Sequence, residues 1–168
     1  FARSGAKCAS PVAIHHDNFA MWNSQVTRWN SVGMGPHRDI TGDLEKAIKA
    51  RGLKFITTFH HGFAWRYFEP SFPYDGVDPQ NADLYTEMHE AKTPPSRRFQ
   101  DAWLAKVSEV LHQYQPDLIW FDFELNSVIS CSLSRPQHRV FCVLHQSSYA
   151  SARSHHPMSD GGDHQRGC

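Results

Sequence analysis

The sequence lacks an excess of either charge, and it lacks any long apolar run. Its 17 Lys and Arg residues balance its 17 Asp and Glu residues, so it has none of the basic excess with which nucleic-acid-binding domains neutralise phosphates. No stretch approaches the roughly 18 consecutive apolar residues that a membrane-spanning helix needs. We therefore expect neither nucleic acid nor a membrane as a partner, and the oligomeric state has no signature in the sequence.

Paired cysteines are also lacking. The chain contains Cys8, Cys131, Cys142 and Cys168, which form no CxxC motif and match none of the common zinc-binding spacings. Unpaired or incidental cysteines, with no metal and no cofactor, are the expectation. The first residue is Phe1 rather than Met, so any signal peptide would have been removed or would lie outside this sequence, and the compartment stays open.

The composition that is present is that of a globular domain. The chain has 168 residues, of which 40% are hydrophobic and 20% charged, enough for one core. Short apolar runs indicate strands at residues 11–14, 53–59 and 118–121. Helical spacing between these runs predicts one helix capped by Thr41 and ending near Gly52, and another capped by Ser96 and closed by Pro116. Strands that alternate with helices predict a parallel sheet with right-handed crossovers.

Polar side chains able to do chemistry follow each predicted strand. His15 and His16 follow the first, His60 and His61 the second, and Asp122 ends the third. Parallel strands end on one edge of a sheet, where α/β barrels carry their catalytic residues, so these groups are expected to converge. An acid at the end of an apolar run is costly unless it is solvated or used. Asp122 is therefore the first catalytic candidate; from its strand alone, a carboxylate capping the next turn is the alternative.

Two loops expected on the same edge are long. Residues 17–40 and 60–95 far exceed the usual strand–helix connection of about 2 to 6 residues. Both are rich in aromatic residues, Trp65 among them, and aromatic rings suit a sugar pocket because the C–H faces of a sugar pack against them. The alternative is that most of these rings fill a small core beneath the loops and only a few contact a ligand.

The alternation of predicted strands and helices stops near residue 125. Residues 126–168 are rich in Ser, His, Arg and Cys, contain no Lys, and show no capped helix. Residues 147–167 have the composition of a disordered segment. We interpret residues 126–168 as an irregular tail beside a domain at residues 1–125, arising from a shifted reading frame or a truncation. A mobile natural extension is the alternative.

Three motifs carry a resemblance to a known family. Residues 13–22, AIHHDNFAMW, resemble the HHDGF-x-x-W signature of the family 29 glycoside hydrolases, the α-L-fucosidases. Residues 26–40 continue in register with the family pattern V-T-D-W-N-S-V…G-P-K-R-D-L, and residues 118–122, LIWFD, resemble its nucleophile strand. The resemblance covers residues 2–125. Its departures from the family's usual residues are Asn18 for Gly, His37 for Lys, Gly33 for a frequent Asp, and Glu124 for an often small residue.

The resemblance implies an α/β fold that is an incomplete (β/α)8 TIM barrel, with about three consecutive parallel strands and crossover helices. Asp122 would be the nucleophile of a retaining α-L-fucosidase, which forms a covalent glycosyl-enzyme that water then hydrolyses. His15 and His16 would bind sugar hydroxyls. Neighbours on a regular strand point to opposite faces, so the strand would have to break at Asp17 and Asn18 for both to reach one pocket.

The resemblance also implies walls for the fucose pocket. These are His60, His61, Trp65 and Trp120, and a core position on the opposite face of the strand is the alternative for Trp120. Burial of one of His15 and His16 beneath the helices is the alternative for that pair. The family's general acid/base lies in a part with no match in this chain, so it is assigned to none of the nearby carboxylates, Asp17, Glu69 and Glu124.

The implied partner is a fucosylated oligosaccharide or glycoconjugate, with no cofactor, and family members are often secreted, periplasmic or lysosomal. Without a matched acid/base, and with open sheet edges, the isolated chain is expected to be poorly soluble and close to inactive. Two alternatives are a non-catalytic carbohydrate-binding remnant and a metal-dependent barrel hydrolase that uses His15, His60 and Asp122. Adjacent histidines chelate one ion poorly from a regular strand, which weakens the metal hypothesis.

Overall fold

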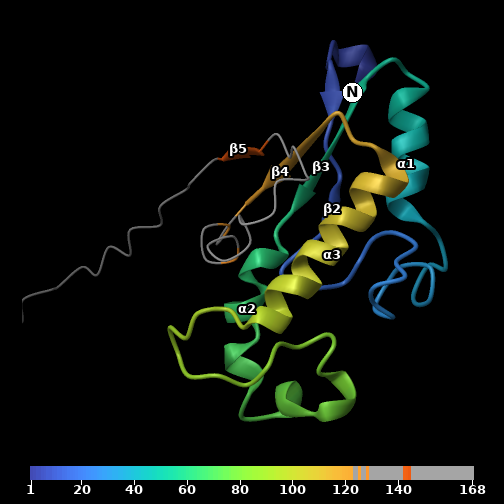
Figure 1. The fold of residues 1–168 in the computed structure, drawn as a ribbon. Coiled ribbons are helices and arrows are strands. Elements are labelled where there is room, and N and C mark those ends of the chain that lie inside the picture. The colour runs from blue at the N-terminus through green and yellow to red at the C-terminus, as the bar shows by residue number, and fades with distance from the viewer. Residues whose placement is uncertain (123–124, 126–127, 129–141, 145–168) are drawn as a thin grey trace, which may run out of the picture.

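The computed structural model describes residues 1–122, 125, 128 and 142–144 (Figure 1). The strands are β1 (Cys8–Ala9), β2 (Val12–Ile14), β3 (Lys54–Phe59), β4 (Leu118–Phe121) and β5 (Cys142–Leu144). The α-helices are α1 (Ile40–Lys49), α2 (Ala64–Tyr67) and α3 (Arg97–Tyr114). Short 3₁₀ helices are η1 (Ala2–Ser4), η2 (His61–Phe63), η3 (Glu69–Ser71), η4 (Asp75–Val77) and η5 (Pro79–Asn81). None of the described helices is long and apolar enough to cross a bilayer.

The strands form one parallel sheet. β1 and β2 both pair with β3, β3 pairs with β4, and β4 pairs with β5. The mixed α/β fold with a parallel sheet is therefore confirmed, with β2, β3 and β4 at the three predicted positions. β5 was not expected, since it lies in the range predicted to be irregular. Apart from residue 128, the rest of residues 126–168 falls outside the described residues, so the division at residue 125 stays a prediction.

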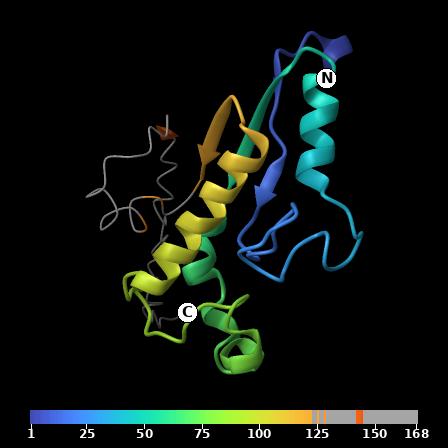
Figure 2. The same cartoon turned by 45° about the vertical axis from the view of Figure 1, so that its right-hand side comes forward.

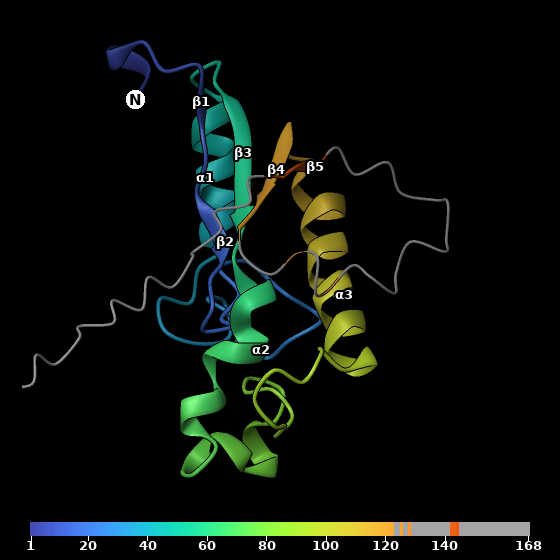
Figure 3. The same cartoon turned by 90° about the vertical axis from the view of Figure 1, so that its left-hand side faces the viewer.

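One face of the sheet is buried beneath α1 and α3. Alternate residues of β3 are buried, beginning with Phe55 and ending with Phe59. They belong to one core with Ile48 of α1, Trp103 of α3 and Phe121 of β4. Figures 1 and 2 show both helices running alongside the strands, and Figure 3 shows the strands in front of α1. Burying this face is the main stabilising contribution to the sheet.

The other face of the sheet is only partly covered. Ile56, Thr58, Leu118 and Trp120 are half-buried, and Val12 is 39% exposed. These residues alternate with the buried ones along their strands, as the period of two requires. The described part of the chain thus has a sheet with one closed face and one partly open face. His60 and Asp122 come two residues after Thr58 and Trp120, which are direct partners in the β3–β4 register.

The helix caps were predicted correctly for one helix and wrongly for the other. Ser96 caps α3, and its hydroxyl accepts a hydrogen bond from the Phe99 amide at 3.1 Å. Asp39 rather than Thr41 caps α1, because its carboxylate accepts from the Gly42 amide at 2.9 Å. The Thr41 side chain is buried inside the first turn and donates to the Met21 carbonyl at 2.9 Å. Both residue types suit a cap, and the tertiary contact with residue 21 decides between them.

A single carboxylate on α3 holds the loop at residues 17–39 against the helix. Glu109 accepts hydrogen bonds from Trp22 Nε1 at 2.9 Å, from Ser24 Oγ at 2.6 Å and from the Gln25 amide at 2.5 Å. Three donors on one charged, part-buried acceptor make stronger bonds than neutral pairs would. This loop begins directly after His15 and His16, so its anchoring fixes the path of the chain away from the strand ends.

Candidate active site

The strand ends lie next to one another because the backbone ladder continues past them. The His60 amide donates to the Ile14 carbonyl at 3.0 Å, and the Asp122 amide donates to the Phe59 carbonyl at 3.1 Å. These bonds place the first residue after β3 beside the end of β2, and the first residue after β4 beside the end of β3. The side chains that follow three separate strands are therefore held at one edge of the sheet.

The side chains at this edge form one cluster, as predicted. The ring centroids of His15 and His16 are 4.2 Å apart, and the rings of His15 and His60 stack at 4.6 Å. His60 Nδ1 lies 3.6 Å from Asp122 Oδ2. His15 is exposed, whereas His16, His60 and Asp122 are half-buried. We call these four residues the strand-end cluster.

The predicted break after β2 is present, and it explains how both adjacent histidines reach the cluster. The register between β2 and β3 is irregular between Val12 and Ile14. Asn18 then has a φ of 62°, a left-handed conformation that asparagine tolerates better than most residues. Its side chain donates to the Leu84 carbonyl at 2.8 Å and accepts from Lys106 Nζ at 2.6 Å. The turn is thus fixed by α3 and by the second long loop.

The imidazoles of His16 and His60 are favoured in their neutral form. Burial, followed by the neighbouring His15 and His60, lowers the pKa of His16 to about 4, and the carboxylates of Asp122 and Asp17 only partly oppose this. Burial and then His15 lower the pKa of His60, against the opposing effect of Asp122. At neutral pH these two rings are uncharged, so each can donate one hydrogen bond, accept another, or offer a lone pair to a metal ion.

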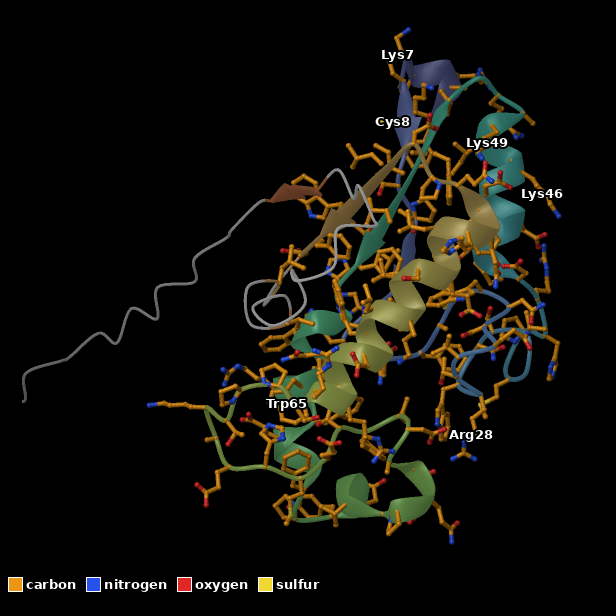
Figure 4. The ribbon with its side chains drawn as sticks, in the orientation of Figure 1. Lys7, Cys8, Arg28, Lys46, Lys49 and Trp65 are labelled. Carbon is orange, nitrogen blue, oxygen red and sulfur yellow. The ribbon has the colours of Figure 1, made fainter. Side chains whose placement is uncertain are left out.

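Two residues predicted as pocket walls, His61 and Trp65, have their ring contacts away from the strand-end cluster. His61 is 1% exposed and packs with its ring stacked on Trp103 at 5.7 Å, towards α3. Trp65 stacks on His89 at 4.0 Å and donates from Nε1 to the Thr93 carbonyl at 2.9 Å. In Figure 4 Trp65 lies between α2 and the beginning of α3. Both rings therefore pack away from the strand-end cluster, and their assignment as walls of one pocket with His15 stays a prediction.

Trp120 lies on the side of β4 that carries Asp122. Ile119 and Phe121 are buried against the helices, while Trp120 is half-buried on the partly open face. Residues two apart on a strand share a face, so the alternative that placed Trp120 in the core opposite the acid was wrong. Trp120 remains a candidate wall.

Two aromatic residues beside the cluster, Phe63 and Tyr67, were not among the predicted pocket walls, although Tyr67 belongs to the long loop noted for its aromatic residues. The ring of His16 lies 4.9 Å from Phe63 and 5.8 Å from Tyr67, measured between centroids. Phe63 and Tyr67 are four residues apart, and the helical turns η2 and α2 place both on one side of this segment. That i, i+4 spacing directly after His60 was the signal that could have identified them.

The contacts of Asp17 and Glu69 do not identify either carboxylate as a second catalytic acid. Asp17 accepts from the Phe19 amide at 3.2 Å, and Glu69 lies 3.3 Å from His89 Nε2. Glu124 falls outside the described residues. The described part of the chain thus supplies Asp122 with three imidazoles and does not identify a general acid.

A separate cavity of about 140 Å³ lies between α3 and the long loops. It is lined by residues that include Asn18, His61, Asp83, Trp103 and Lys106. Burial lowers the pKa of Lys106 to about 8, although Asp83 and Glu109 oppose this shift. None of the four residues of the strand-end cluster lines this cavity, so we treat it as part of the packing that holds the Asn18 turn.

Known proteins resemble this chain along most of the described region. The family model described as alpha-L-fucosidase matches residues 1–160. The tissue alpha-L-fucosidase of Rattus norvegicus is 33% identical over 125 residues, which are 74% of this chain and 24% of that protein. The alpha-L-fucosidase of Dictyostelium discoideum is 33% identical over 122 residues, 71% of this chain and 23% of its own length. The chain therefore spans about a quarter of the relatives it matches.

Solved structures agree with this relationship. The crystal structure of Thermotoga maritima alpha-fucosidase superposes with a TM-score of 0.57 at 34% identity, covering 73% of this chain and 26% of that one. The same enzyme in complex with fucose gives a TM-score of 0.55 at 33% identity, covering 71% of this chain and 26% of the other.

Proposed function

The chain belongs to the alpha-L-fucosidase family, and on that premise we propose that Asp122 is the nucleophile of a retaining α-L-fucosidase. The observation that carries the proposal is the meeting of Asp122 with His15, His16 and His60 at one edge of a parallel sheet. Such an edge is where a (β/α)8 barrel carries its chemistry. The three predicted strands and their crossover helices would be a consecutive part of that barrel.

In the proposed reaction the Asp122 carboxylate attacks the anomeric carbon of an α-L-fucoside. The glycosidic bond breaks, the leaving-group oxygen takes a proton, and a glycosyl-enzyme ester forms that water then hydrolyses. Retaining enzymes hold the second carboxyl about 5 to 5.5 Å from the nucleophile. The chain spans about a quarter of its relatives, so we assign this acid/base to a part of the enzyme beyond the described residues.

The neutral imidazoles would hold the sugar. A fucose ring presents several hydroxyl groups, each a donor and an acceptor, and uncharged His16 and His60 offer both functions. An uncharged His60 beside Asp122 also leaves the carboxylate its negative charge for the attack, whereas an imidazolium would stabilise that charge and blunt it. Trp120 offers an apolar surface two residues before the acid. The proposed substrate is a fucosylated oligosaccharide or glycoconjugate.

Chemical labelling tests the nucleophile without requiring the absent acid. In 2-deoxy-2-fluoro-fucosyl fluoride the fluoride leaves without protonation, and the 2-fluorine slows hydrolysis of the ester that forms. We expect the 168-residue chain to gain one fluorofucosyl group on the tryptic peptide that carries Asp122, as measured by mass spectrometry. Asp122→Asn should abolish the adduct, while the matched control Asp101→Asn, on an exposed part of α3, should keep it.

The other outcomes separate the alternatives. Binding of fucose with no adduct would favour the non-catalytic carbohydrate-binding remnant. Hydrolysis that appears only after Zn²⁺ is added would favour the metal-dependent hydrolase. Adduct formation at a residue other than 122 would refute the assignment of the nucleophile.

A further inference from the structure

The three imidazoles of the strand-end cluster have the spacing of a metal site. One ring nitrogen from each of His15, His16 and His60 can be chosen so that all three lie within 4.8 Å of one another. The Asp122 carboxylate lies 3.6 Å from His60 Nδ1 and is the nearest fourth ligand that we infer. These ligands come from the ends of three strands, so the sheet itself holds them in place.

The donor set selects one class of ion. Three imidazole nitrogens and one carboxylate oxygen match four-coordinate Zn²⁺, whose bonds to nitrogen are about 2.0 to 2.1 Å long. Mg²⁺ and Ca²⁺ prefer sites made of oxygen atoms. Tetrahedral ligands at these bond lengths lie about 3.4 Å apart, so small rotations of the rings would close the present spacing.

The objection to adjacent histidines does not apply to this backbone. Two neighbours on a regular strand point to opposite faces, but β2 ends at Ile14, before either histidine. The turn at Asn18 then brings both rings to one side, with their centroids 4.2 Å apart. An ion can reach the cluster from solvent, because His15 is exposed.

We propose that His15, His16, His60 and Asp122 bind a divalent cation of the zinc class, and that the bound ion excludes the fucosyl group. The proposal that the cluster binds a cation rests on the geometry alone. The second half rests on the proposed function: a cation bound by the Asp122 carboxylate makes it a weaker nucleophile and occupies the space beside it, and each ligated imidazole nitrogen can no longer accept a hydrogen bond from a sugar hydroxyl. The ion is therefore an inhibitor rather than a cofactor.

The experiment uses the full 168-residue chain, fused to a soluble carrier protein that has no histidine tag. Co²⁺ is the probe for geometry, since a four-coordinate site gives it a strong visible absorption, and Zn²⁺ displaces it for affinity. The test variant is His15→Gln, an exposed position where the fold should tolerate the change. The matched control is His155→Gln with His156→Gln, a pair of adjacent histidines that contains no member of the strand-end cluster.

We expect one equivalent of Co²⁺ to bind the chain, and His15→Gln to weaken Zn²⁺ binding by roughly 100-fold, because even outer-shell changes cost roughly 10- to 100-fold. The His155 and His156 variant should bind like the wild type. Equal affinity in the wild type and His15→Gln, with matching circular dichroism spectra, would refute the site. Should His15→Gln misfold, His60→Gln serves as the second variant with the same expectation.

A competition experiment tests the second half. Saturating Zn²⁺ should weaken binding of L-fucose to the wild type by at least about tenfold, and His15→Gln should show no such effect. Fucose binding that is indifferent to Zn²⁺ would overturn the exclusion while leaving the metal site intact. Failure of the Asp122 labelling, with metal binding retained, would instead count against the proposed glycosidase.

Discussion

Two histidine–carboxylate pairs in this molecule have similar side-chain spacing but different surroundings. His60 Nδ1 lies 3.6 Å from Asp122, and His89 Nε2 lies 3.3 Å from Glu69. The carboxylates are equally exposed, at 26% for Asp122 and 28% for Glu69. The exposure of the carboxylate therefore does not distinguish a reactive pair from a structural one.

The difference lies in what surrounds each ring. His89 has its other nitrogen 2.6 Å from the Glu87 carbonyl, and its ring stacks on Trp65 and meets the edge of Phe72. All these partners belong to one long loop or to its start. The ring of His60 instead stacks on His15 at the junction of three strands. A pair enclosed by its own loop holds that loop together, whereas a pair shared between strand ends can meet a ligand.

Replacing each acid with its amide gives the largest expected difference between the two pairs. Asp122→Asn should reduce the rate of labelling by the fluorofucosyl reagent by roughly 10³-fold or more, because the nucleophile is lost. Glu69→Gln should leave the rate unchanged in whatever fraction folds. Mass spectrometry against time measures both rates. A comparable loss in Glu69→Gln would show that the two pairs act together.

For the free energy of unfolding, a change at residue 89 should have a larger effect than a change in the strand-end cluster. His89→Ala removes a buried ring stacked on Trp65, and we expect it to lower the free energy of unfolding by about 2 to 4 kcal/mol. His15→Ala changes an exposed side chain and should stay within about 0.5 kcal/mol of the wild type. Urea denaturation followed by circular dichroism gives both values. Equal destabilisation by the two changes would remove the distinction.

The affinity for L-fucose should change less than the labelling rate does, and again the change should occur in the strand-end cluster and not at residue 89. His60→Gln should weaken L-fucose binding by about tenfold, since the loss of one hydrogen bond to a ligand costs about 1 to 1.5 kcal/mol. His89→Gln should bind fucose as the wild type does. Isothermal titration calorimetry on both variants decides the matter, and a larger effect at residue 89 would contradict it.

The smallest expected effect is on pH dependence. The folded-state pKa of His16 is lowered to about 4, so the unfolded chain binds more protons between that pH and the ordinary value near 6.5. Stability should therefore fall as the pH drops from 6.5 towards 4, by about 1 kcal/mol after allowance for the solvent around this half-buried ring. In His16→Gln this part of the pH profile should flatten, as denaturation at several pH values would show.

The sequence predicted what local patterns can specify. The run at residues 118–121 identified a strand, Ser96 identified a cap, and polar residues after three strands identified the cluster. It did not separate His60 from His61, because the turn that sends one ring to the rim and the other under α3 is set by tertiary packing. The cap at Asp39 and the burial of Trp65 were missed for the same reason. β5 was missed because no capped helix precedes it in a segment rich in Ser, His, Arg and Cys, so the alternation of strand and helix that identified the other strands is absent there.

The parallel pairing of the strands has a consequence for how the chain folds. Cys8 pairs with Lys54, and Ile56 pairs with Leu118, so each ladder closes a long loop, a topology associated with slow folding. On a ribosome the chain emerges from its amino terminus, and β2 and β3 are available before β4 has been made. The three imidazoles can therefore meet before Asp122 exists, and the carboxylate is the last member to join the cluster.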